Sequence, residues 1–184
     1  MAPTHVAIPE GPMPLLSLIL VAAFPAVVII AALRDATTMT IPNWLCLTGA
    51  ALFPPAALVA HLSLPGAGLS LACGLGFLIV GMVMFALRWI GGGDAKLLAV
   101  CALWMGWPQV VNFLFWTAIS GGGLAVVLIG SRRIAALGPA FGPRWLNRLL
   151  QPDGDIPYGI AIAIGAMIAY PQSPVFQMLH RAGG

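Results

Sequence analysis

Long, nearly uninterrupted apolar runs separated by short polar stretches dominate the chain. Six such runs can be drawn, and they cover residues 15–33, 44–62, 69–89, 97–106, 110–129 and 156–170. The first would extend about 28 Å as a helix, enough to cross a bilayer. The fourth is too short to span unless it begins near Asp94, and could instead be re-entrant. No run alternates with the two-residue period of a membrane β-barrel. The pattern predicts an all-α, polytopic membrane bundle of about six transmembrane segments.

The composition supports a membrane location. Hydrophobic residues make up 60% of the 184 residues and charged residues only 7%, whereas a soluble domain carries about 25% charged residues. The excess apolar surface must face lipid. We expect a single membrane-embedded domain over residues 14–172, with tails at 1–13 and 173–184.

The basic residues predict the orientation in the membrane. Seven of the eight are placed in the loops that follow the first, third and fifth runs: Arg34, Arg88, Lys96, Arg132, Arg133, Arg144 and Arg148. The eighth, Arg181, lies in the carboxy-terminal tail. The positive-inside rule places the seven in the cytoplasm and both termini outside. Residues 1–14 contain no lysine or arginine, so the first run is expected to be a retained helix and not a cleaved signal peptide.

Two features of the apolar background have structural interpretations. In the cytoplasmic loop at about 131–155, the stretch "PRWLNRLLQ" (143–151) predicts a short helix lying in the membrane interface, or alternatively a substrate-docking surface. Small residues four apart (Ala72 and Gly76, Ala118 and Gly122, Ala161 and Gly165) either allow close helix packing or reflect general Ala and Gly richness.

Several chemical functions are excluded or disfavoured. The longest basic run is Arg132-Arg133, too little for nucleic-acid binding. The cysteines at 46, 73 and 101 form no CxxC pair and are expected to be packing residues. The histidines at 5, 61 and 180 are too scattered to bind a metal. We therefore expect no metal and no cofactor.

The five acidic residues hold the candidate chemistry. Glu10 lies in the amino-terminal tail, Asp153 belongs to a predicted turn, and Asp155 is expected to cap the sixth helix. Asp35 and Asp94 are placed instead at the cytoplasmic membrane edge, at the ends of different helices. Two carboxyl groups brought together there would share one proton and could hydrolyse a peptide bond. The alternative is that Asp94 only caps the fourth helix and Asp35 only ends the first loop.

The segments around these two acids resemble the motifs of the type IV prepilin peptidases. "GGGDAK" (91–96) resembles the Gly-x-Gly-Asp motif, "DATTMTIPN" (35–43) resembles the first-aspartate motif, and "IPYGIAIAIGA" (156–166) resembles the last helix. The resemblance implies that Asp35 and Asp94 are the catalytic pair. It also implies supporting roles for six motif residues: Gly91, Gly93, Lys96, Ile41, Pro42 and Asn43, of which the last three would set the turn into the second helix.

The resemblance further implies an aspartic endopeptidase of the bacterial inner membrane. Its expected substrate is a prepilin-like protein, whose short basic leader is cleaved on the cytoplasmic side, and its other expected partners are membrane lipids. Only a few residues separate Asp35 from Ile41, and no CxxC is present. The chain therefore resembles the short, peptidase-only members associated with Flp-type pili, in which N-methylation is absent.

Two alternatives are weaker. Presenilin-like proteases share Gly-x-Gly-Asp, but there a tyrosine usually precedes the first aspartate and a Pro-Ala-Leu motif follows, whereas Arg34 precedes Asp35 and no Pro-Ala-Leu occurs. A small transporter or a non-enzymatic pilus scaffold is the alternative from another class. A transporter would place ionisable residues near mid-helix, and the runs contain only His61 and Arg88, both near ends.

Overall fold

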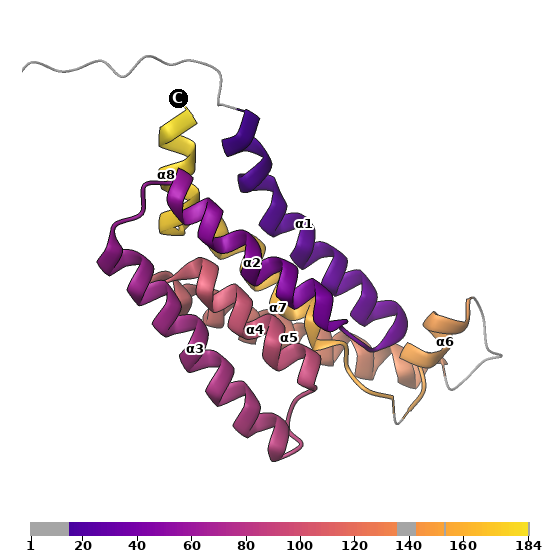
Figure 1. Ribbon diagram of the computed structural model, residues 1–184. Coiled ribbons are helices and arrows are strands. Elements are labelled where there is room, and N and C mark those ends of the chain that lie inside the picture. Colours follow the sequence, from indigo (N-terminus) through magenta and orange to yellow (C-terminus); the bar gives the residue numbers. More distant parts are fainter. Residues whose placement is uncertain (1–14, 136–142, 153, 184) are drawn as a thin grey trace, which may run out of the picture.

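The computed structural model describes residues 15–135, 143–152 and 154–183, and within these ranges its regular secondary structure is helical (Figure 1). The predicted all-α class is confirmed. The elements, in chain order, are α1 (Leu15–Thr38), α2 (Asn43–Val59), α3 (Leu64–Ala86), α4 (Gly92–Met105), α5 (Gln109–Ala135), α6 (Arg144–Leu149), α7 (Tyr158–Ala169), the 3₁₀ turn η1 (Tyr170–Gln172) and α8 (Pro174–Gly183).

Three of these helices, α1, α3 and α5, are long and apolar enough to cross a membrane. A fourth span results if α7, η1 and α8, which bend by 50°, are taken as one unit, and α2 is a shorter apolar helix. The chain is a multi-pass helical membrane protein. The count of about six segments stays a prediction.

The helix α4 lies at the centre of the bundle (Figure 1) and contacts α2, α3, α5, α7 and α8. It begins at Gly92, so the short fourth run extends upstream past Asp94, but its 14 residues reach only about 21 Å. Nearly every residue from Ala95 to Met105 is buried. A helix that is apolar on all sides belongs in an interior, and here that interior is the middle of the bundle.

An aromatic cluster fixes α4 against α1, α2 and η1. Trp104 is fully buried and its ring centroid lies 4.8 Å from that of Phe24, 5.8 Å from Phe53 and 6.2 Å from Tyr170. Its indole N–H donates a 2.8 Å hydrogen bond to the carbonyl oxygen of Gly49. The one polar atom of this large side chain is therefore satisfied inside the core.

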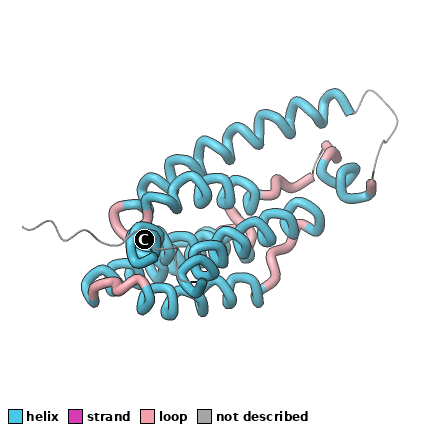
Figure 2. Tube along the Cα trace, turned by 90° about the horizontal axis from the view of Figure 1, so that it is seen from above, coloured by secondary structure: helices cyan, strands magenta, loops and turns pink. Residues whose placement is uncertain are grey.

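The short elements near the ends of the bundle differ in their packing. Residues 174–183 form α8, which contacts α1 and α2 and buries Val175 and Leu179 completely. The helix expected within 143–151 forms as α6, and Figure 2 shows it beside the end of the long helix α5. Its placement in a lipid interface stays a prediction. The predictions for His5, Glu10 and Asp153 concern residues that lie outside the described ranges.

Close packing at small residues holds for one of the three predicted pairs. A Cβ added to Gly165 would overlap the hydroxyl of Thr117 and lie 2.7 Å from the Thr117 backbone nitrogen, so α5 and α7 approach at this glycine. Ala161, its partner, is fully buried. A Cβ added to Gly76 or Gly122 would meet nothing within 4 Å.

This contrast gives a stability prediction. Gly165→Ala should destabilise the protein by about 1–3 kcal/mol, the usual cost of overpacking, because the backbone of α5 must move. Gly122→Ala adds the same methyl group to open space and should leave stability unchanged or slightly raised, since alanine favours helix over glycine. The measurement is the melting temperature of both purified variants in one detergent. Equal melting temperatures would contradict the close contact of α5 and α7.

Candidate active site

Asp35 is a buried carboxylate in the last turn of α1, with an exposed fraction of 5%. The sequence placed it just beyond the first helix, but Thr38 is the last residue of α1. The next residue, Met39, has a positive φ of 55° and lies outside the helix. The oxygen Oδ2 of Asp35 accepts a 2.7 Å hydrogen bond from the backbone N–H of Gly159 in the first turn of α7. This hydrogen bond fixes the orientation of the carboxyl group against the start of α7.

Gly159 is a site residue that the search for acidic residues missed. A Cβ at this position would lie 2.8 Å from Oδ2 of Asp35 and 2.9 Å from its Cβ, so a side chain would push the carboxylate away. The glycine therefore allows the close approach that the hydrogen bond needs. The available signal was its position in "IPYGIAIAIGA", but nothing local to that segment indicates the contact with Asp35.

Asp94 lies in the first turn of α4, outside the helices that are long enough to span a membrane. Burial raises the pKa of its carboxyl group to about 7; the negative charge of Asp35 adds to this shift, and the backbone N–H of Gly91 opposes it. Its Oδ1 is buried and has no hydrogen-bond partner among the described residues. A buried carboxyl oxygen without a hydrogen-bond partner is uncommon in folded proteins. Gly91 is the N-cap of α4, and its backbone N–H interacts with the carboxyl group of Asp94. Asp94 can therefore help to cap the helix and still take part in chemistry in the cavity.

The motif glycines are explained by close approach and not by unusual dihedral angles. A Cβ on Gly93 would lie 2.9 Å from Cβ of Ile41, and a Cβ on Gly91 would lie 2.8 Å from Oδ2 of Asp94. The first contact lets the start of α4 pack on the turn between α1 and α2. The second leaves the Asp94 carboxyl group unobstructed.

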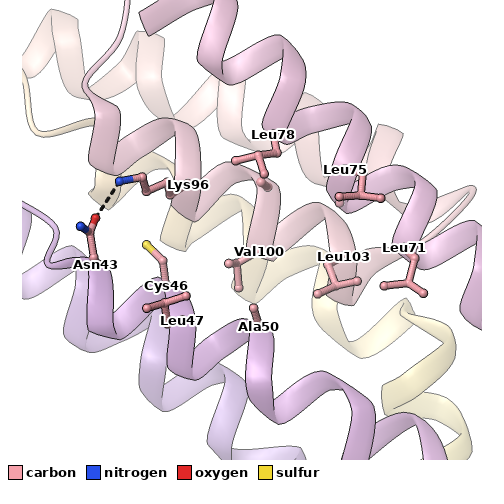
Figure 3. A pocket seen from close by; sticks show the side chains of 12 residues that line it. Asn43, Cys46, Leu47, Ala50, Leu71, Leu75, Leu78, Lys96, Val100 and Leu103 are labelled. Atoms are coloured by element: carbon pink, nitrogen blue, oxygen red, sulfur yellow. Dashed lines mark hydrogen bonds between the residues drawn. The ribbon is translucent and has the colours of Figure 1, made fainter.

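The remaining motif residues connect α2 to α4. Ile41 is buried, Pro42 is the N-cap of α2 and Asn43 is its first residue. The Nζ atom of Lys96 donates a 2.7 Å hydrogen bond to Oδ1 of Asn43 (Figure 3). Lys96 does not point at the two aspartates: residues two apart on a helix face opposite sides.

The two aspartates line one cavity of about 370 Å³. Its wall also contains an arginine, a third aspartate and several apolar and aromatic residues, which are Met39, Phe85, Arg88, Trp89, Ile90, Gly91, Asp155, Ile156 and Tyr158. The structure thus brings together Asp35 and Asp94 from α1 and α4, as the sequence predicted. The other lining residues were not predicted.

The predicted capping role of Asp155 is wrong. The N-cap of α7 is Pro157, two residues later, and it makes no side-chain capping hydrogen bond. The backbone N–H of Gly159, in the first turn of α7, has no partner within its own helix. It donates to Asp35 of α1 instead. Asp155 is exposed and lines the same cavity as the two buried aspartates.

Arg132 holds the segment that leads into α7. It is buried within α5, not in a loop, and its Nε donates to the carbonyl oxygen of Leu149 at 3.0 Å. A guanidinium nitrogen also donates to the carbonyl oxygen of Asp155 at 2.8 Å. A Cβ on Gly154 would lie 3.1 Å from this guanidinium group. The arginine therefore stabilises the cavity wall next to Gly159.

Comparison with known proteins identifies the family of the chain. The model of the type IV leader peptidase family matches residues 22–126, which include both aspartates. The prepilin leader peptidase/N-methyltransferase of Bacillus subtilis (strain 168) is 31% identical over 153 residues, covering 77% of this chain and 61% of the relative, so the chain spans about three fifths of that protein's length. No solved structure matches. The chain belongs to the type IV leader peptidase family.

Proposed function

We propose that the protein is a membrane-embedded aspartic endopeptidase that cleaves the leader peptide of type IV, Flp-like prepilins at the cytoplasmic face of the membrane. The observation that carries this proposal is the shared cavity of Asp35 and Asp94, which come from different helices and lie in different electrostatic surroundings. Family membership and the prepilin peptidase activity named for the Bacillus subtilis relative support the choice of substrate.

The two surroundings assign separate roles in the resting enzyme. We assign the general base to Asp35, because the backbone N–H of Gly159 holds one of its carboxyl oxygens in a fixed orientation in the cavity. Asp94 has a pKa of about 7 and keeps a proton near neutral pH, so it is the general acid. A carboxyl group that keeps its proton beside a second carboxyl group suits acid–base chemistry.

The proposed reaction uses only water and the two carboxyl groups. Asp35 takes a proton from water as the water oxygen bonds to the scissile carbonyl carbon, while Asp94 gives its proton to the carbonyl oxygen. The tetrahedral diol then collapses: Asp35 passes its proton to the leaving nitrogen, the C–N bond breaks, and Asp94 recovers a proton from a diol hydroxyl. Both residues end in their starting states.

The charges around the cavity fit a basic leader. Asp155 adds a third carboxylate to the wall, and Arg88 is the one basic residue among the lining residues. Opposite charge raises the local concentration of a cationic peptide. The orientation predicted from the basic residues places this end of the bundle at the cytoplasm, where the uncleaved leader would lie.

Removing either carboxyl group tests the proposal directly. Asp35→Asn and Asp94→Asn should each reduce leader cleavage by about 10²–10⁴-fold, the usual contribution of a general acid or base. The measurement is cleavage of a purified prepilin by the purified variants, with circular dichroism to verify the fold. Glu10→Gln, the acid in the amino-terminal tail, is the control. Full cleavage by either Asn variant would instead favour the scaffold or transporter alternative.

The pKa of Asp94 predicts the pH dependence. Because its raised pKa is about 7, Asp94 loses its proton as the pH rises through 7, and kcat/KM should fall on the alkaline side of neutrality. The apparent pKa of this limb belongs to the coupled pair. The measurement is kcat/KM for a leader peptide from pH 5 to 9. A rate that stays constant or increases up to pH 9 would contradict the assignment of Asp94 as the acid.

The contact between Gly159 and Asp35 gives a third test. Gly159→Ala places a methyl group 2.8 Å from Oδ2 of Asp35 and should lower kcat/KM by about 10²-fold, since a displacement of about 1 Å at a reacting group costs that much. Gly130→Ala, which meets nothing within 4 Å on α5, is the matched control. Equal activity of the two variants would show that the Gly159 hydrogen bond is dispensable.

A further inference from the structure

A second cavity lies on the opposite side of α4 from the aspartates. Its volume is about 450 Å³, and it is formed by α2, α3 and α4 (Figure 3). The helices α2 and α3 each pack on α4 and scarcely on one another, which leaves a groove between them. Most of its lining is apolar: Leu47, Ala50, Leu71, Gly74, Leu75, Leu78, Ala99, Val100 and Leu103, together with Cys46.

The polar groups of the groove are gathered at one end. Figure 3 shows Lys96 and Asn43 together there, and the Nζ–Oδ1 hydrogen bond joins them at 2.7 Å. Lys96 is exposed and forms no ion pair in the described part of the chain. An ammonium group has three donors and no acceptor, and an asparagine amide adds two donors. This end of the groove therefore favours an anionic group with several acceptor oxygens.

The groove follows α4 from Lys96 to Leu103, a length of about 10 Å at 1.5 Å per residue. The flanking side chains are lipid-accessible, with Leu47 68% and Leu75 60% exposed.

We propose that this groove binds one anionic phospholipid, with its phosphate on Lys96 and Asn43 and an acyl chain along α4 between α2 and α3. Charge decides between the possible occupants. A basic prepilin leader would be repelled by the unpaired ammonium group, whereas an anionic headgroup is attracted by it. In the orientation predicted above, Lys96 faces the cytoplasmic leaflet, which is rich in anionic lipid. This inference does not depend on the proposed peptidase activity.

The test compares an anionic lipid with a zwitterionic lipid that carries the same acyl chains. The delipidated protein in detergent is titrated with phosphatidylglycerol or phosphatidylcholine carrying identical chains, and bound lipid is counted by native mass spectrometry. We expect one phosphatidylglycerol to bind about fivefold more tightly than phosphatidylcholine, the ratio expected for one lysine near an anionic headgroup. Glycerol phosphate, which lacks acyl chains, should not displace it at equal concentration.

Variants locate the site. Lys96→Gln should abolish the preference for phosphatidylglycerol, while Arg133→Gln, which removes an exposed charge on α5, should keep it. Ala50→Phe should weaken binding of both lipids by filling the groove. Leu75→Trp, at an exposed position, serves the same purpose if the Ala50 variant does not fold.

The proposal is overturned if Lys96→Gln keeps the full preference, if neither groove-filling variant weakens binding, or if glycerol phosphate displaces the lipid. It is also overturned if a photo-crosslinker at position 75 captures prepilin or a second copy of this chain in a bilayer instead of phosphatidylglycerol. None of these outcomes depends on cleavage, so they are distinguishable from failure of the peptidase proposal.

Discussion

The close approach of α4 to its neighbours is the constraint on which the site depends. Four glycines mark the contacts, and a Cβ on any of them would come within 3.0 Å of a neighbouring side chain: Gly49 with Val100, Gly74 with Leu103, Gly81 with Ala95, and Gly93 with Ile41. In lipid, helices associate through such close packing because burial of apolar surface gives little driving force. The central position of α4 follows from these contacts. Its first turn is thereby held beside the end of α1, where Asp35 lies.

This packing places two carboxyl groups in one cavity, and their hydrogen-bonding surroundings differ. Asp35 accepts the N–H of Gly159, whereas Oδ1 of Asp94 has no partner in the described part of the chain. Arg132 stabilises the segment leading to Gly159 through backbone carbonyl groups, so the asymmetry depends on α5 and α7 as much as on the helices that carry the aspartates.

The two faces of α4 serve different environments. Asp94 and Lys96 are two residues apart and therefore point in opposite directions on the helix. Asp94 lines the cavity that also contains Asp35, while Lys96 lies at the head of the apolar groove between α2 and α3. One short motif thus supplies both the proposed acid and a cation that is positioned for lipid. It is the hydrogen bond from Lys96 to Asn43 that links the groove to the start of α2.

The sequence by itself determined the membrane class and the helical fold, because hydropathy is a local property, and the resemblance of its motifs to a known family singled out Asp35 and Asp94, which the structure places on one cavity. It did not reveal Gly159, whose partner Asp35 is 124 residues away, or the role of Arg132. It misassigned Asp155, since Pro157 starts α7 later than expected. Nor did hydropathy distinguish the buried α4 from lipid-facing helices, because lipid and a protein core are equally apolar. Only the tertiary structure decided which carboxyl group receives a backbone hydrogen bond, since that contact joins helices distant in the chain.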